Sequence, residues 1–265
     1  MFTVGMATYD DYEGVFFTVQ SLRLYHPLVT EIIIIDNNPD SKHGELCKKL
    51  ANNGVNIKYI PYTEKKSSFS KGEVFKYANN EKVVVCDCHI LFPLNAFESL
   101  KEFYDNHHKP YDFIQGPLLY DDLKTKSTHL KEGWGTQFYG KWDTMEIQDS
   151  YAEIPAQGMG VFSCKKNEWL GFNEKFTGFG GEEYYIHQKY KNKGGRCICV
   201  KDFIWHHRFG RPYGVPFPNI LEERLKNYII GRVELSLPFN DVIEEFEKVL
   251  KKETINSIIK QITNT

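Results

Sequence analysis

The chain has 265 residues, of which 41% are apolar and 15% aromatic, enough for one large domain or a domain with an appendage. A net charge of -2 and an isoelectric point near 6.5 give no overall basic character. Nucleic-acid binding is therefore weakened as the main role, although a local basic groove could still form. Apolar runs are shorter than the roughly 18 residues of a membrane span, and the N-terminus has no signal-peptide pattern. We expect a cytoplasmic protein.

The cysteines are interpreted as small buried residues in a reducing compartment. Two Cys-x-Cys pairs could suggest zinc, but structural zinc pairs more often leave two to four residues between the cysteines. Both pairs also lie in apolar, strand-like runs, which favours burial. The six cysteines are Cys47, Cys86, Cys88, Cys164, Cys197 and Cys199.

The first third of the chain alternates between short apolar runs and helical periodicity. Strands are expected over residues 2–7, 31–35, 55–59 and 82–87. Helices are expected over residues 13–25, over residues 41–53 and before residues 79–80. This alternation predicts an α/β fold with a parallel sheet covered by helices. Right-handed crossovers then place the loops at Tyr9, Asp36 and Asp87 on one edge, where ligands bind.

The most informative stretch is the apolar run over residues 83–86, which is followed directly by Asp87-Cys88-His89. Residues i and i+2 of an extended chain point to the same side, so Asp87 and His89 can close on one ion. A carboxylate and an imidazole suit a borderline divalent metal such as Mn²⁺. The alternative is a capping aspartate followed by a surface histidine.

Two features follow in the middle of the chain, after an expected helix over residues 94–105 and a strand over residues 111–115. Residues 120–150 are polar and aromatic around Trp134, and so long a segment indicates either a functional lid or an ordinary insertion. Residues 156–164 have the pattern of a strand, and glycines such as Gly158 within it allow close approach of a ligand.

The last third contains a charged block and a helical tail. Glycines precede Glu182 and Glu183, which open a helix expected over residues 182–193, where the helix dipole favours carboxylates. A strand over residues 196–200 is followed by the His206-His207-Arg208 cluster. Two amphipathic helices are expected in the tail, over residues 219–231 and from residue 239 to the end.

Together, these motifs resemble the GT-A class of nucleotide-sugar glycosyltransferases, over about residues 2–215. The Asp87-Cys88-His89 motif, the block from Gly178 to Glu183 and the later His207-Arg208-Phe209 are similar to polypeptide N-acetylgalactosaminyltransferases and β-1,4-galactosyltransferases. The resemblance implies a Rossmann-like, mostly parallel sheet flanked by helices. We expect residues 1–215 to form the glycosyltransferase domain and residues 216–265 a C-terminal helical extension packed on it.

The resemblance also implies a donor site and a metal site. Mn²⁺, or Mg²⁺, would be held by Asp87, His89 and His207, although His206 is an alternative to His207. Asp36 would contact the uracil or ribose of a UDP-sugar. The residues expected to bind this donor are Thr8, Tyr9, Asp36, Lys71, Asp87, Arg208, Arg211 and Tyr213.

Catalysis is assigned by the same resemblance. Glu182 and Glu183 would lie at the sugar and at the acceptor hydroxyl. Glu183 would be the base if the reaction inverts configuration, and neither need act as base if it retains configuration. Further substrate contacts are expected at Trp134, Gln157, Gly158 and Gly181.

We expect a bacterial or viral cytosolic relative without the membrane anchor, lectin domain and disulfide context of both named families, so their acceptor specificity is not transferred. The acceptor could be a glycan, a lipid-linked sugar, a protein or a modified base in DNA. Two alternatives are a non-catalytic sugar- or nucleotide-binding module and a nucleotidyltransferase. The latter normally has a basic, glycine-rich loop after its first strand, and residues 7–11 are acidic instead. UDP rests on the resemblance alone, and the sequence leaves the oligomeric state open.

Overall fold

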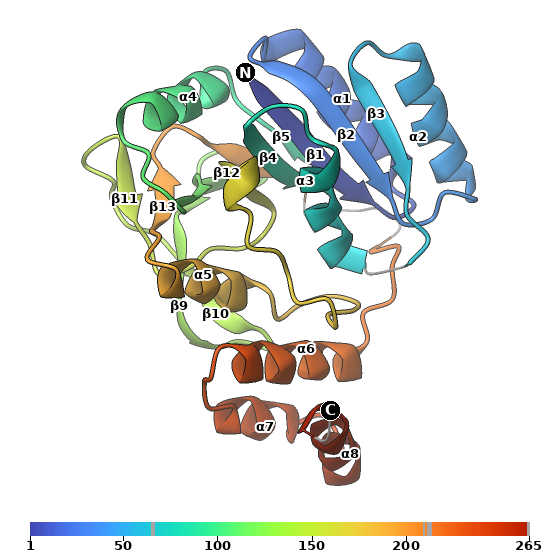
Figure 1. Ribbon diagram of the computed structural model, residues 1–265, viewed down its shortest axis with the longest axis vertical. Helices are drawn as coiled ribbons and strands as arrows, with labels where there is room; N and C mark the ends of the chain where they lie inside the picture. Colours follow the sequence, from blue (N-terminus) through green and yellow to red (C-terminus); the bar gives the residue numbers. More distant parts are fainter. Residues whose placement is uncertain (65–66, 209, 211–213, 264–265) are drawn as a thin grey trace.

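An eight-stranded, mostly parallel sheet forms the centre of the protein (Figure 1). The computed structural model describes residues 1–64, 67–208, 210 and 214–263. The strands run in the spatial order β11-β13-β6-β12-β4-β1-β2-β3. Their bounds are β1 Phe2–Thr8, β2 Val29–Asp36, β3 Ile57–Pro61, β4 Lys82–Asp87, β6 Phe113–Gln115, β11 Tyr151–Glu153, β12 Val161–Lys165 and β13 Cys197–Val200. The predicted α/β class and parallel arrangement are confirmed, with β12 and β11 as the antiparallel strands.

Helices cover both faces of this sheet, because its central strands are apolar on both sides. On one face lie α1 (Tyr12–Tyr25), α2 (Lys42–Asn53) and α4 (Ala96–Asn106), whose apolar residues pack with Val4 and Met6 of β1. The other face carries the 3₁₀ helix η1 (Ser67–Glu73), α3 (Val74–Tyr77) and α5 (Glu183–Asn192). The two faces therefore have separate hydrophobic cores.

The segment over residues 120–150, expected to be a lid or an insertion, contains ordered strands. A hairpin pairs β9 (His129–Trp134) with β10 (Tyr139–Asp143) in antiparallel fashion. A small sheet has the order β5-β14-β7-β8, with bounds Ile90–Leu91, Trp205–His207, Leu118–Leu119 and Lys126–Ser127. This sheet brings the chain after residue 204 back beside the end of β4.

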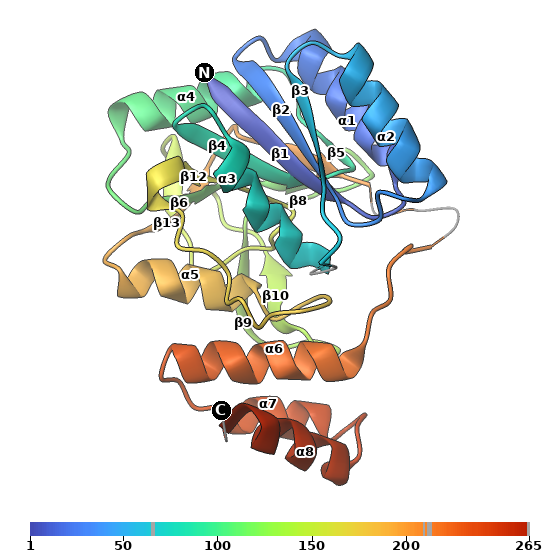
Figure 2. The ribbon, with the colours of Figure 1, turned by 45° about the vertical axis from the view of Figure 1, so that its right-hand side comes forward.

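The C-terminal helices gather at one end of the molecule, beyond α5 (Figure 2). They are α6 (Leu221–Glu234), α7 (Asn240–Phe246) and α8 (Lys252–Thr263), so the second helix expected in the tail is two helices. They have their own apolar cluster, centred on Leu225 and Phe246, while α6 also contacts α5. Among the described residues, no helix is long and apolar enough to cross a membrane.

Replacing Gly116 with alanine is expected to destabilise the protein by about 1–3 kcal/mol, the usual cost of overpacking. A Cβ at Gly116 would lie 1.7 Å from the carbonyl oxygen of Phe203. The Gly116 carbonyl also accepts a hydrogen bond from Nε1 of Trp205, the first residue of β14. Urea unfolding measures the effect. In the control Gly135→Ala, the nearest contact is an ordinary 3.6 Å, so an equal loss in both variants would contradict the explanation.

Candidate active site

A pocket of about 340 Å³ lies at the edge where β1 and β4 end. Parallel pairing aligns Thr8 with Asp36 and Ala7 with Asp87, so the strand ends meet there. Asp36 itself does not line the pocket, although several other residues predicted from the sequence do. These lining residues are Thr8, Tyr9, Lys71, Asp87, His89, His207 and Arg208.

Three of the pocket residues could hold one metal ion. Ligand atoms of Asp87, His89 and His207 all lie within 4.8 Å of one another. The two imidazole Nε2 atoms are 3.3 Å apart, and His207 Nε2 is 3.5 Å from Asp87 Oδ2. Pairing of β14 with β5 brings His207 beside this group, although it lies 118 residues from His89. By contrast, His206 Nδ1 contacts the Leu119 carbonyl and its Nε2 contacts Asp121, so the geometry favours His207.

Lys71 is buried at the base of this group. Its ammonium donates hydrogen bonds to Asp87 Oδ1 at 3.2 Å and to the Met159 carbonyl at 2.8 Å. Burial by itself would raise the pKa of Asp87, but the charge of Lys71 and the hydrogen bond that His207 donates outweigh it, and the net pKa lies well below the ordinary value. Asp87 is therefore held as a carboxylate, the form that binds a cation.

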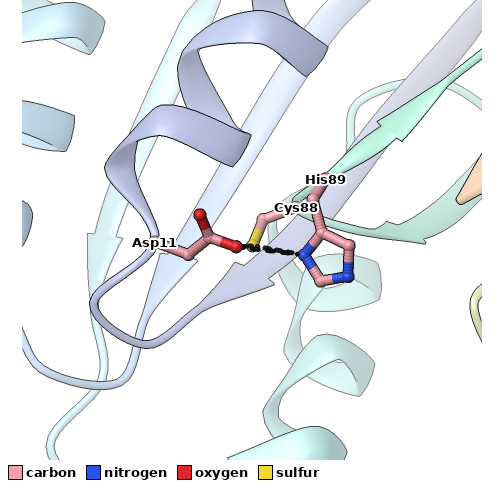
Figure 3. A group of neighbouring side chains, drawn as sticks. All are labelled: Asp11, Cys88 and His89. Carbon is pink, nitrogen blue, oxygen red and sulfur yellow. Dashed lines mark hydrogen bonds and ion pairs between the residues drawn. The ribbon is translucent and has the colours of Figure 1, made fainter. Parts of the chain in front are cut away.

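Arg208 was expected to face a diphosphate, and the structure pairs it with Asp11. Its Nη2 lies 2.7 and 2.9 Å from the two carboxylate oxygens of Asp11. The same carboxylate is 3.2 Å from Nδ1 of His89 (Figure 3), whereas Nε2 of that ring faces His207. Asp11 was not among the residues predicted for the site. Its importance arises from contacts between segments 197 residues apart, for which the sequence carries no local signal.

Asp36 was expected to contact the donor nucleoside, but its carboxylate is used inside the protein. It accepts hydrogen bonds from the Asn38 amide at 2.9 Å and the Tyr59 hydroxyl at 2.8 Å. The next residue, Asn37, lines the pocket instead. Asn37 Oδ1 and Thr8 Oγ1 are buried there with no hydrogen-bond partner among the described residues. The structure thus favours Asn37 over Asp36 as a contact for a ligand.

The two glutamates lie at the start of α5. Glu182 is buried and Glu183 half-buried, and Oε2 of Glu182 has no hydrogen-bond partner within the described part of the chain. Burial raises the pKa of both carboxyl groups, and the charge of Glu182 raises that of Glu183 further. Lys71 lowers the pKa of Glu182 and Asp87 raises it. The two glutamates are therefore coupled electrostatically to Asp87, His89 and His207, called here the metal-type group. A carboxyl group with a raised pKa is suited to accept a proton.

The glycine-rich segment before these glutamates is held by the C-terminal extension. The Asn227 amide, on α6, donates to the carbonyls of Thr177 at 2.7 Å and Gly180 at 3.0 Å. Its oxygen accepts from the Thr177 amide at 3.1 Å. Gly180 and Gly181 have φ of +93° and +97°, a region that favours glycine, so the turn needs both residues. The extension therefore positions the loop that leads into Glu182.

The structure places the expected substrate-contact residues outside the pocket. Trp134 Nε1 donates to Asp241 on α7, and its ring packs on Tyr228, so it joins the hairpin to the extension. Gln157 is fully buried and donates to the Thr128 carbonyl. Trp142 lies against Gly158, and Gly181 lines a separate cavity of about 190 Å³. Arg211 and Tyr213, expected at the donor, lie outside the described residues.

The same architecture occurs in solved structures. GalNAc-T7 with UDP, GalNAc and Mn²⁺ matches with a TM-score of 0.68 and 14% identity, covering 94% of this chain and 54% of that one. TarS 1-349 of S. aureus with UDP-GlcNAc matches with a TM-score of 0.60 and 12% identity, covering 98% of this chain and 81% of that one. The mannosyltransferase PcManGT of Pyrobaculum calidifontis with GDP-Man and Mn²⁺ matches with a TM-score of 0.56 and 11% identity, covering 97% of this chain and 72% of that one. The chain therefore has the GT-A fold of glycosyltransferases, and it spans about half the length of the GalNAc-T7 chain.

The family is shown by the sequence. The profile described as Glycosyl transferase family 2 matches residues 3–166, more than half of the chain. The protein thus belongs to glycosyltransferase family 2, which confirms the predicted class of enzyme. No curated protein matches the chain.

Proposed function

We propose that this glycosyltransferase moves a sugar from a UDP-sugar to an acceptor hydroxyl and depends on a divalent metal, with Mn²⁺ favoured. The observation that carries the proposal is the convergence of Asp87, His89 and His207 at one pocket. In this proposal residues 1–215 form the catalytic domain and residues 216–265 form the helical extension.

The donor set fits the metal. One carboxylate oxygen and two imidazole nitrogens suit a borderline cation such as Mn²⁺ better than a hard one such as Mg²⁺. When bound, the metal would neutralise charge on the leaving nucleoside diphosphate. The related fold of GalNAc-T7 was solved with Mn²⁺ and UDP, and PcManGT with Mn²⁺ and GDP-Man, which supports the proposal for this chain.

The pocket is compatible with uracil as the base. The Asn37 amide nitrogen donates to Ser70 Oγ at 2.7 Å and lies 3.4 Å from the Ser67 carbonyl, which fixes the orientation of the amide. Its oxygen is therefore the atom left for a ligand, and it can accept a hydrogen bond from an N–H or an O–H donor. The adjacent Thr8 hydroxyl can donate to a carbonyl. Uracil presents an N–H group next to a carbonyl and so matches both atoms, but guanine presents the same pair, so these two atoms do not distinguish UDP from GDP.

The chain's own charged residues have separate roles in the proposed transfer. Lys71 holds Asp87, and Arg208, which is paired with Asp11, lies at the same pocket. In an inverting reaction, the acceptor oxygen forms a bond to the anomeric carbon as the sugar–phosphate bond breaks. The proton of the acceptor hydroxyl passes to the Glu183 carboxylate, and the diphosphate leaves with the bonding electrons.

The acceptor is proposed only as a class, a hydroxyl on a glycan, a protein or a modified DNA base. The nucleotidyltransferase alternative is set aside by the family assignment. A non-catalytic binding module is disfavoured, because Asp87, His89 and His207 come together at the pocket and the chain also carries both glutamates, which lie outside the pocket lining.

Calorimetry with UDP, GDP and CDP, each with and without Mn²⁺, tests the proposal. We expect UDP to bind more tightly in the presence of Mn²⁺ and to bind more tightly than the other two nucleotides. Tight GDP binding would leave the metal assignment standing and replace the donor. Absence of metal-dependent binding for all three nucleotides would contradict the proposed function.

A further inference from the structure

Asp11 connects three segments at the edge of the pocket. It caps α1, where its Oδ1 accepts a hydrogen bond from the Gly14 amide at 3.1 Å. Its carboxylate is paired with Arg208, just after β14, and with His89, just after β4. Only 7% of Asp11 is exposed, so these contacts are shielded from water. Figure 3 shows the carboxylate directed at the imidazole edge that carries Nδ1.

This contact decides which nitrogen of His89 can bind a metal. An ionised carboxylate only accepts hydrogen bonds, so the 3.2 Å contact favours a proton on Nδ1, which also lies 3.5 Å from Cys88 Sγ. The Arg208 guanidinium lies 2.7 and 2.9 Å from the two oxygens of Asp11 and so favours the ionised form of this carboxyl group. In the neutral ring, a proton on Nδ1 leaves the lone pair on Nε2. That atom faces Nε2 of His207.

An alternative use of this corner is a metal site of its own. Asp11, Cys88 and His89 lie close enough together to bind one ion. The Arg208 guanidinium already occupies both oxygens of this carboxylate, however, and its positive charge opposes a second cation there. The contacts therefore favour an orienting role for Asp11 over direct metal binding.

We propose that Asp11 is a positioning residue that fixes the tautomer and ring orientation of His89 for metal binding, and that it places Arg208 at the same edge. Carboxylates that accept the second N–H of a metal-bound histidine raise its basicity and hold its ring, and their loss typically weakens metal binding about 10–100-fold. The metal-binding part of this inference rests on the proposed function, whereas the tautomer does not.

The variant Asp11→Asn tests the proposal with little change of shape. Asparagine is also a good N-cap. Its oxygen should keep the place of Oδ1, because the Gly14 amide and the Arg208 guanidinium are both donors there. The amide nitrogen then faces Nδ1 of His89 and donates to it. The proton of His89 is driven to Nε2, the atom required by the metal.

Nitrogen-15 NMR of the metal-free protein reads the tautomer, with the His89 signals assigned by their loss in His89→Gln. We expect a proton on Nδ1 in the wild type and on Nε2 in Asp11→Asn. Calorimetry with Mn²⁺ in the presence of UDP should show an affinity about 10–100-fold lower in the variant. Asp10→Asn is the matched control, since the Asp10 carboxylate accepts hydrogen bonds from the Asn38 side chain and not from His89, and should preserve both readouts.

A wild-type His89 protonated at Nε2 would overturn the proposal without any variant. So would an Asp11→Asn protein with the wild-type tautomer and the wild-type Mn²⁺ affinity. If the wild type shows the Nδ1 proton but binds no Mn²⁺, the tautomer assignment stands and the proposed metal dependence fails. The two hypotheses are therefore distinguished by separate measurements.

Discussion

Asp87→Asn is expected to remove Mn²⁺-dependent UDP binding and to lower sugar transfer about 1000-fold. The reason is loss of the carboxylate from the metal-type group, since charge stabilisation by a metal contributes several kcal/mol and each 1.36 kcal/mol is tenfold in rate. Calorimetry and a UDP-release assay measure the two effects. Asp121→Asn, at an exposed carboxylate beside His206, is the control and should behave like the wild type.

A second variant separates loss of the ligand from loss of folding. Asp87→Asn also leaves the buried Lys71 ammonium without its counter-ion, and breaking a buried pair typically costs about 3–5 kcal/mol of stability. His207→Ala removes a proposed ligand while the Lys71–Asp87 pair remains. We expect it to lose Mn²⁺-dependent binding with a smaller decrease in melting temperature. Normal metal dependence in a folded His207→Ala protein would argue against the site.

Glu183→Gln is expected to lower transfer about 100–10,000-fold while UDP binding persists, because general-base catalysis contributes on that order. The raised pKa of Glu183 gives a second readout. A base must be deprotonated, so wild-type activity should rise with pH at values above the ordinary glutamate pKa. That acidic limb should be absent from the residual activity of the variant. Glu222→Gln, at an exposed position on α6, is the control.

Stability provides an independent check on the same residue. A folded-state pKa above the unfolded value means that stability is lost as the pH rises through the interval between them. Glu183→Gln removes the ionisable group and should therefore raise the urea midpoint on the alkaline side. If transfer persists in Glu183→Gln and falls only in Glu182→Gln, the base assignment moves to Glu182. Full activity in both variants would favour a retaining reaction.

The sequence predicted the parts of the site that depend on local pattern. The apolar run before Asp87 marks a buried strand, and period-two geometry puts Asp87 and His89 on one side, so their proximity follows from residues next to each other. The choice of His207 over His206 depends on the register of β14 against β5, which no local pattern specifies. Asp11 was missed because its partners come from distant segments.

Other predicted site residues have partners inside the protein that polarity alone does not indicate. Trp134 lies between glycines in a polar segment, which suggested a ligand-binding loop, yet its ring packs against the C-terminal helices. Asp36 stands at the correct strand end, but Tyr59 and the Asn38 amide already occupy its carboxylate. In both cases the decisive partner comes from tertiary structure, and a single sequence does not reveal it.

The hydrogen bonds between Asn227 on α6 and the glycine-rich loop before Glu182 have a consequence for how this enzyme could diversify. The metal-type residues, Lys71 and Asn37 all come from outside the C-terminal helices, whereas the loop before Glu182 is tied to α6. On the proposed assignment, changes in the tail can move the acceptor side while the donor chemistry stays intact. Chimaeras that exchange α6 to α8 between family members would then alter acceptor choice and conserve the sugar donor. Laboratory selection for new acceptors should accordingly begin in the tail.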